Sequence, residues 1–144
     1  MKTELTKDIK KAIFKEVGAC GLGVYGCIEV AFGKAYGDQY CDFMTMDSNS
    51  VFRCYEIKIS KSDFRSKNKL SFYGDYNYIV MPKELYEEVK SEVYYGLGVY
   101  LYDGKVCKLH RKSNKTKVTI GERVDLMHCM VRSLSRFQTK LIKE

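Results

Sequence analysis

Apolar and polar residues alternate along several short segments and recur at helical spacing along others. Alternation is typical of strands, and recurrence every three to four residues is typical of helices. The pattern predicts helices over residues 4–17, 61–72, 83–93 and 122–142, and strands over 23–32, 40–46, 51–59, 76–81, 97–102 and 105–110. This order of elements predicts an α/β protein, a sandwich of helices around a central mixed β-sheet.

The last predicted helix has an apolar stripe and an opposite basic face. We expect the stripe to pack on the core, and the alternative is that it forms the seam of a homodimer. The stripe contains Met127, Met130, Val131, Leu134, Phe137 and Leu141. The basic face contains Arg132, Arg136, Lys140 and Lys143.

Two of the predicted strands flank the polar turn 47–50, where Asp and Asn favour a hairpin by bonding their own backbone. If the apolar residues of the second strand mostly face the core, Glu56 and Lys58 share a face two residues apart. Asp42 on the first strand can then meet them. Two carboxylates from neighbouring strands can hold a hard divalent cation such as Mg²⁺. The alternative is an ordinary cross-strand ion pair on a solvated face.

The spacing of Asp42 and Glu56-Ile57-Lys58 resembles the PD-(D/E)XK nuclease superfamily. The residues that follow resemble its bacterial DNA-repair nuclease-like branch and the phage and mobile-element relatives of that branch. They are Ser62-Asp63-Phe64-Arg65, Lys69, Tyr73, Asp75-Tyr76, a strand that ends at Pro82, and the glycine-led segment 96–100. The likeness covers residues 28–108, and it departs from the motif at Cys41, which stands where the motif has Pro.

The resemblance implies a restriction-endonuclease-like fold, a three-layer α/β/α sandwich with a central mixed sheet. It also implies a Mg²⁺-dependent deoxyribonuclease, an endonuclease in which Mn²⁺ can substitute. Asp42 and Glu56 would hold the metal with the backbone carbonyl of Ile57, and Lys58 would support the attacking water. Such a metal polarises a phosphoryl oxygen and makes a bound water nucleophilic.

A further acid of this site is expected at Glu29, a lone charge within the predicted first strand. Burial of an unpaired carboxylate is costly, so Glu29 must face solvent, a partner or a metal. The relatives carry a Glu at a similar place, which favours Glu29 as a third acid of the site. A first-helix acid reaches the metal in some members, which makes Glu4 and Asp8 candidates, although solvated helix charge is the simpler interpretation.

The predicted helix 61–72 has a basic face next to this candidate site. Lys61, Arg65 and Lys69 recur every four residues, so they share one side and can hold DNA phosphates. Lys69 and Tyr73 also match the motif of the related branch. The alternative is an ordinary solvated helix surface.

Composition places the chain among globular proteins with an anionic partner. Its 144 residues predict one domain, residues 1–144, with 45% apolar and 30% charged residues. The net charge of +7 and a pI near 9.0 favour nucleic acid over membrane, because no apolar run of membrane-spanning length occurs. The alternative is a basic protein without such a partner. With no signal peptide at the N-terminus, the expected location is the cytoplasm.

Six cysteines would then be reduced thiols, and we interpret them as small core residues. Cys107 and His110 with His128 and Cys129 suggest a zinc site, but their spacing is not that of known zinc motifs.

The function expected from the sequence is thus DNA cleavage by a protein of phage or mobile-element type, in repair, recombination or processing. Replication or repair proteins are possible partners. Two alternatives remain: a non-catalytic nucleic-acid-binding module that keeps the nuclease fold, and a regulatory protein whose basic surface is incidental.

Overall fold

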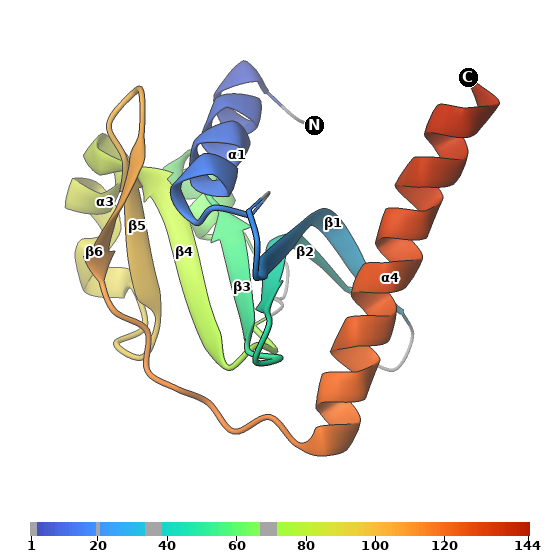
Figure 1. Cartoon of the computed structure of the whole chain (residues 1–144). Helices are drawn as coiled ribbons and strands as arrows, with labels where there is room; N and C mark the ends of the chain where they lie inside the picture. Colours follow the sequence, from blue (N-terminus) through green and yellow to red (C-terminus); the bar gives the residue numbers. More distant parts are fainter. Residues whose placement is uncertain (1–2, 20, 34–38, 67–71) are drawn as a thin grey trace.

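The computed structural model describes residues 3–19, 21–33, 39–66 and 72–144 (Figure 1). Over these residues the chain forms a six-stranded mixed sheet flanked by helices, so the predicted α/β sandwich class is confirmed. The elements follow in the order α1 (Glu4–Glu16), β1 (Val24–Gly33), β2 (Gln39–Asp47), β3 (Phe52–Ile57), α2 (Lys61–Phe64), β4 (Tyr76–Pro82), α3 (Lys83–Val89), a 3-10 turn (Lys90–Glu92), β5 (Gly98–Tyr102), β6 (Cys107–Arg111) and α4 (Ile120–Lys143).

The strands lie in the sheet in their sequence order, from β1 at one edge to β6 at the other. The pairs β1–β2, β2–β3 and β5–β6 are antiparallel, whereas β3–β4 and β4–β5 are parallel. Parallel neighbours need a crossover connection, and the segments containing α2 and α3 supply the two crossovers. β3 is therefore an inner strand, with an antiparallel neighbour on one side and a parallel neighbour on the other.

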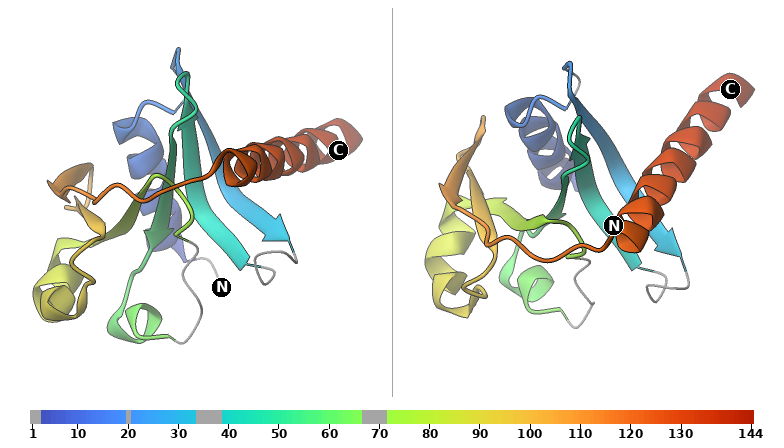
Figure 2. Two further views of the ribbon diagram at one scale, coloured as in Figure 1. Left: turned by 90° about the horizontal axis from the view of Figure 1, so that it is seen from below. Right: turned by 60° about the horizontal axis from the view of Figure 1, so that its bottom comes forward.

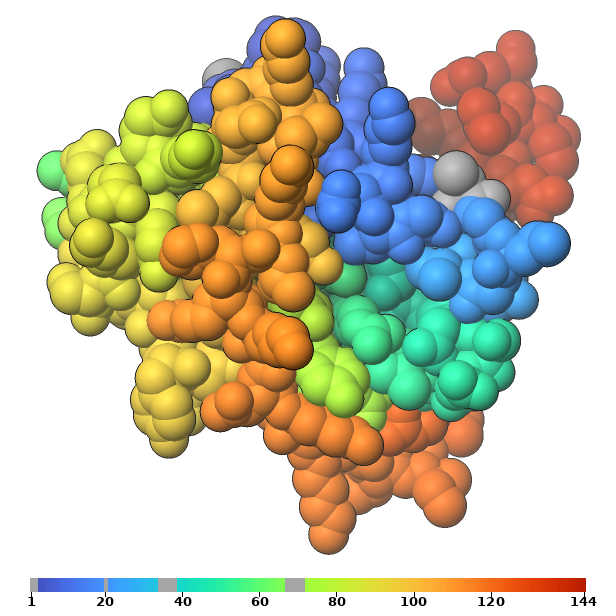
Figure 3. Space-filling model, turned by 60° about the vertical axis from the view of Figure 1, so that its left-hand side comes forward, coloured from blue at the N-terminus to red at the C-terminus, as the bar shows by residue number. Residues whose placement is uncertain are grey.

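The two faces of the sheet are covered by different helices (Figures 1 and 2). Tyr55 of β3 packs in a cluster with Ile13 of α1. Its neighbours Phe52 and Cys54 pack in another cluster with Met130 of α4. α3 covers β4 and β5 in a third cluster, and β6 lies between α1 and α3 at the sheet edge (Figure 3). Because β3 is buried on both faces, polar side chains at its end are close to the core.

The structure contains the predicted hairpin and the predicted first helix, and hydrogen bonds between residues close in sequence define both. The Asp47 carboxylate accepts hydrogen bonds from the N–H groups of Asn49 (2.8 Å) and Val51 (3.1 Å), which closes the turn between β2 and β3. Thr3 caps α1 by accepting a hydrogen bond from the Thr6 N–H (3.2 Å).

The predicted helix 61–72 is wrong in extent. Helix α2 ends at Phe64, and neither Ser66 nor Phe72 is helical; residues 67–71 lie outside the described part of the chain. Ser60 caps α2 by accepting a hydrogen bond from the Asp63 N–H (3.1 Å). Ser has weak helix propensity because its side chain competes for backbone hydrogen bonds, so the basic residues alone do not extend the helix.

The last helix differs from its prediction in its start and in its buried face. It begins at Ile120 because Thr119 and Glu122 form a capping box. The predicted apolar stripe is only partly core: Met130 is buried and Phe137 is half-buried. The other predicted members are exposed, namely Met127, Val131, Leu134 and Leu141. A stripe read from apolar residues alone cannot tell which side of the helix meets the sheet.

Candidate active site

Asp42 lies on β2 at the point where β2 separates from β3. The ladder between these strands ends at the pair Phe43 and Tyr55. Beyond it, the Asp42 carboxylate accepts a hydrogen bond from the Ile57 N–H (2.8 Å). The side chain of Asp42 thereby replaces a backbone ladder bond, and it is held at the C-terminal end of β3.

Glu56 precedes Ile57 and would be opposite Asp42 if the ladder continued by one residue. Its exposed fraction is 6%. The Ile57 nitrogen is bonded to the carbonyl carbon of Glu56, so the hydrogen bond to Ile57 places the Asp42 carboxylate beside Glu56. Because Glu56 is buried, a salt bridge on a solvated face does not describe this position.

Glu29 on β1 faces Asp42 across the β1–β2 ladder, since Ile28 and Val30 pair with the residues on either side of Asp42. Glu29 has a φ of 53°, a left-handed conformation that costs a residue with a side chain roughly 1–2 kcal/mol. Ile28 packs toward α1, whereas Val30 packs toward α4. The strand therefore changes faces at Glu29, and the strain is located at a predicted site residue.

The Glu29 carboxylate forms an ion pair with Lys10 of α1, at 3.6 Å from the Nζ of Lys10. The Lys10 side chain has an exposed fraction of only 13%. Sequence reasoning did not include Lys10 in the site. In the sequence Lys10 is one of several lysines of the first helix. That position does not reveal that its side chain pairs with a carboxylate on another element.

Lys58 lies directly after β3, and its N–H donates to the Val80 carbonyl (3.0 Å) of β4. Its side chain is 8% exposed, with Nζ 3.8 Å from one carboxylate oxygen of Asp63. The other oxygen of Asp63 accepts a hydrogen bond from the Ile59 N–H (3.0 Å). Asp63 thus holds both the ammonium group and the backbone at the end of β3. The sequence indicated Asp63 only as one of the residues that resemble the nuclease branch, without a role in the site.

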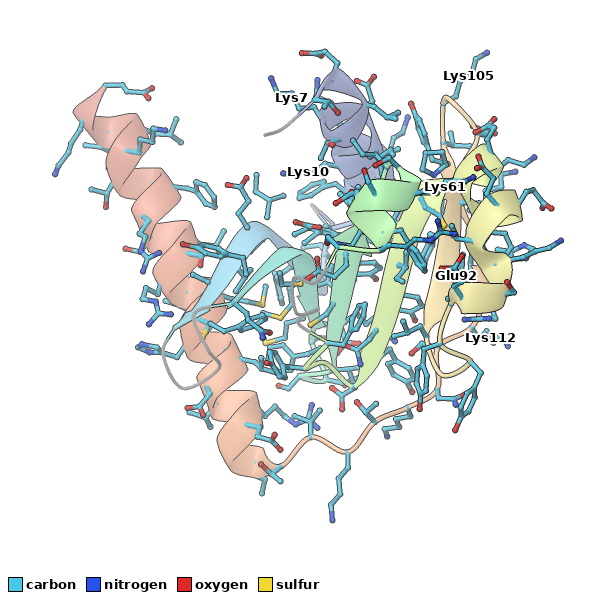
Figure 4. All side chains as sticks on the ribbon, turned by 180° about the vertical axis from the view of Figure 1, so that it is seen from behind. Lys7, Lys10, Lys61, Glu92, Lys105 and Lys112 are labelled. Carbon is cyan, nitrogen blue, oxygen red and sulfur yellow. The ribbon has the colours of Figure 1, made fainter. Side chains whose placement is uncertain are left out.

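Two of the predicted phosphate-binding residues form ion pairs with α3 and the turn after it (Figure 4). The Lys61 Nζ is 2.6 Å from Glu88, and Arg65 donates two hydrogen bonds to Glu92 (2.9 and 2.6 Å). The hydrogen bond from Arg65 lowers the pKa of Glu92 and raises that of Arg65. Lys69, the third member of the predicted basic face, lies outside the described residues.

Tyr73, the remaining predicted nucleic-acid contact, is half-buried near the start of β2. Its hydroxyl donates to the side-chain oxygen of Gln39 (2.9 Å), and its ring meets Phe32 edge to face with the centroids 5.1 Å apart. In this structure Tyr73 joins the segment before β4 to β1 and β2.

A groove of about 600 Å³ lies between α1 and α4, over β1. Lys7, Lys10 and Lys11 line it on the α1 side, and apolar side chains including Phe14 and Phe137 complete its lining. Figure 4 shows Lys7 and Lys10 on α1. Since Lys10 also pairs with Glu29, the groove adjoins the kinked part of β1.

The positions of the His, Cys, Asp and Glu side chains limit the metal sites that the described residues can form. Among them, no three His, Cys, Asp or Glu side chains are grouped so that they could hold one metal ion. Asp42, Glu56 and Glu29 therefore do not form a single three-acid cluster, and neither do the residues of the considered zinc site. Glu4, a candidate first-helix acid, pairs with Lys7 at an exposed surface (3.6 Å).

The described cysteines are buried thiols, as the core interpretation expects: Cys27, Cys41, Cys54, Cys107 and Cys129. Burial raises the pKa of Cys27 to about 11 and that of Cys107 to about 12. Thiolates are the reactive and metal-binding form, so these thiols are poor ligands and poor nucleophiles. Cys20 lies outside the described residues.

Comparisons with known proteins bear on the fold. No model of a protein family matches the sequence, and no curated protein matches it. The structure is similar to that of a protein of unknown function from Silicibacter pomeroyi, with a TM-score of 0.78 and 14% sequence identity, over 98% of this chain and 93% of that chain. At this identity the likeness establishes the fold alone, and it extends over nearly the whole chain.

No helix within the described residues, the 24-residue α4 included, combines the length and apolar character that a membrane span requires.

Proposed function

We propose that this protein is a metal-dependent nuclease that hydrolyses DNA phosphodiester bonds. It would be of phage or mobile-element type and act in DNA repair, recombination or processing. The observation that carries the proposal is the hydrogen bond from the Ile57 N–H to Asp42 (2.8 Å), which brings Asp42 beside Glu56, two residues before Lys58. The charged residues of the D…ExK pattern thus come from two strands to one end of β3.

The donor set at this end of β3 fits Mg²⁺, with Mn²⁺ as a substitute. Mg²⁺ takes oxygen ligands and is typically held by one or two protein carboxylates, with water and phosphate completing its shell. Asp42 and Glu56 supply two carboxylates. In an extended strand the N–H and C=O of one residue point to the same side, so the Ile57 carbonyl is directed toward Asp42. These three groups would hold the metal.

A bound Mg²⁺ would act as a Lewis acid on a phosphoryl oxygen. The protein supplies the rest of the chemistry. The Ile57 amide orients the Asp42 carboxylate, and the Lys58 ammonium supports the attacking water and stabilises negative charge that develops on the phosphate. Asp63 positions Lys58, and Glu29 adds a carboxylate opposite Asp42.

Backbone phosphates would be held by Lys61 and Arg65 at α2, together with Lys69 and Tyr73, which match the motif of the related branch. Lys61 and Arg65 would exchange their carboxylate partners for phosphate oxygens. The buried, reduced thiols agree with a cytoplasmic location for this activity.

The experiment is cleavage of labelled duplex, single-stranded, forked and four-way DNA in Mg²⁺ or Mn²⁺. We expect Asp42→Asn and Lys58→Ala to lower the cleavage rate at least about 100-fold, because each removes a group that acts on the transition state. Glu84→Gln, an exposed carboxylate of α3, is the control and should cut like wild type. Circular dichroism checks that each variant is folded. Wild-type cleavage by Asp42→Asn or Lys58→Ala would reject this site.

A non-catalytic nucleic-acid-binding module is the second candidate. It is favoured by the burial of the Lys58 side chain, 8% exposed, and its pairing with Asp63. This candidate predicts DNA binding that neither metal nor Asp42→Asn alters, and no cleavage across the panel. A regulatory protein with an incidental basic surface predicts no salt-dependent DNA affinity at all.

A further inference from the structure

Helix α4 has two distinct apolar faces. One is buried against β1 and β2 and includes Leu126, Cys129 and Met130. The other is exposed and runs along the whole helix. Its members, with their exposed fractions, are Ile120 (84%), Val124 (60%), Met127 (36%), Val131 (61%), Leu134 (43%) and Leu141 (72%).

The exposed stripe follows a seven-residue repeat. With Gln138 included, the intervals between successive members alternate between four and three residues. This is the spacing of the two apolar positions in a coiled-coil heptad. At 100° per residue the stripe lies about 120° around the helix from the buried face. It therefore points to the side of α4 and not into the sheet, and apart from Leu134, which lines the groove beside α1, the domain's own core does not account for it.

The position of α4 leaves this stripe accessible. The helix crosses the β1–β2 hairpin and its C-terminal half projects past the sheet (Figures 1 and 2). Continuous exposed apolar surface of this kind marks an interaction site in soluble proteins.

We propose that the exposed stripe of α4 is the interface of a homodimer, in which the α4 helices of two copies pair side by side and antiparallel. A second copy is the occupant because the stripe matches itself: both helices have the same repeat, and a two-fold dimer joins identical surfaces. No stripe position carries a charged residue, so pairing leaves no buried charge. This inference does not depend on the proposed nuclease function.

The length of the stripe suffices for a stable pair. A helix of 24 residues is about 36 Å long and offers three heptads. When Val124 of one helix lies opposite Leu141 of the other, the helices overlap over residues 122–143, and the five apolar side chains from Val124 to Leu141 are buried. A pair of this length reaches the low end of specific interfaces, about 600 Å² per partner.

The helix dipoles favour the antiparallel arrangement, because it sets the positive N-terminal end of each α4 beside the negative C-terminal end of the other. On the side of the helix opposite the stripe lie the charged residues near the two ends of α4, namely Glu122, Asp125, Arg136, Lys140 and Lys143. They therefore stay in solvent in either orientation, and the interface buries no charge. In the antiparallel register Val124 lies opposite Leu141 of the second copy, and Val131 opposite Leu134.

Sedimentation equilibrium of the full chain tests the dimer. We expect a mass of twice 16.7 kDa at high concentration, dissociating on dilution. Val131→Glu places a carboxylate at the centre of the stripe and should raise the dimer dissociation constant at least about tenfold, because the charge would be buried. Because Val131 is 61% exposed in the single chain, this variant should keep the wild-type circular dichroism, and its melting temperature should equal that of wild type at dilutions where both are monomeric.

Thr139→Glu is the matched control. It adds the same charge to the same helix, at an exposed position about 100° from the stripe, and the dimer should persist. A wild-type chain that stays at 16.7 kDa at every concentration would overturn the proposal. So would a dimer that Val131→Glu leaves intact, or one that Thr139→Glu disrupts equally.

Cross-linking tests the orientation. Single variants Val124→Cys and Leu141→Cys, each with Cys20→Ser, are treated with a short bismaleimide. The described native thiols are buried and should not interfere. We expect cross-links when the two variants are mixed and not when either is alone. Cross-links within each variant alone would show a parallel pair and overturn the antiparallel arrangement.

Discussion

Asp75 joins the start of β3 to α4, two elements that are far apart in sequence. Its carboxylate accepts hydrogen bonds from the Phe52 N–H at the start of β3 (2.8 Å) and from both terminal nitrogens of Arg123 in α4 (2.7 and 3.0 Å). Burial by itself raises the pKa of Asp75, but the hydrogen bonds from Arg123 and the Phe52 amide outweigh it, so the pKa is lowered. The ionised form therefore stabilises the folded chain above the ordinary pKa of an aspartate, and this stabilisation is lost as pH falls through the lowered value.

We predict that Asp75→Asn lowers the free energy of unfolding by about 3 kcal/mol at neutral pH, because it leaves the Arg123 guanidinium without its carboxylate partner. The difference from wild type should shrink as pH falls through the lowered pKa of Asp75, because its carboxylate then becomes protonated. Urea denaturation at neutral and at strongly acidic pH measures it, with the exposed-site variant Glu84→Gln as control. A difference that is the same at both pH values would contradict the assigned role of the ion pair.

At the scale of elements, α2 is held to α3 and the turn after it by charge pairs at the surface. Arg65 and Glu92 have exposed side-chain fractions of 52% and 39%, and Lys61 and Glu88 of 52% and 48%. Exposed pairs such as these contribute little to stability. They can therefore exchange partners at small cost, which is what phosphate binding by α2 would require.

We predict that Glu92→Gln strengthens DNA binding about threefold at low salt, since it frees Arg65 for phosphate. Glu87→Gln is the matched control: it removes the same charge from α3 but disrupts only the pair with Lys90. Fluorescence anisotropy with a labelled oligonucleotide measures both. The gain should vanish when Arg65→Ala is added. Equal gains in Glu92→Gln and Glu87→Gln would mean that only net charge matters and that α2 does not touch DNA.

At the scale of the whole molecule, the effect of the net charge of +7 on a nucleic-acid partner depends on where the positively charged side chains lie. Lys7, Lys10 and Lys11 line the groove between α1 and α4, next to the kinked β1 residue Glu29. This arrangement would guide a nucleic-acid backbone toward the end of β3, where Asp42 and Glu56 lie.

We predict that DNA affinity falls roughly a hundredfold when the salt concentration rises about fourfold, as expected for about four phosphate contacts. Lys11→Gln should lower the slope of log affinity against log salt by about 0.7 to 0.9, one phosphate contact. Lys105→Gln, on the β5–β6 turn away from the groove (Figure 4), should leave the slope unchanged. A slope near zero for the wild type would reject nucleic acid as the partner.

Features that depend on neighbouring residues could be predicted from the sequence. The turn at residues 47–50 and the alternation along β1 to β5 led to the correct element order and fold class. The physical reason is that turn formation and strand periodicity involve groups within a few residues of one another. The site at Asp42, Glu56 and Lys58 stays a prediction, for which the hydrogen bond from the Ile57 N–H to Asp42 is the supporting contact.

Features that depend on distant neighbours were decided only by the tertiary structure. The ion pair of Lys10 with Glu29 and that of Arg65 with Glu92 join residues on different elements, so no local pattern reveals them. The buried side of α4 was mispredicted for a related reason. Apolar and basic residues on a helix define its faces, but which face is buried depends on where the sheet lies, and that follows from packing of the whole chain.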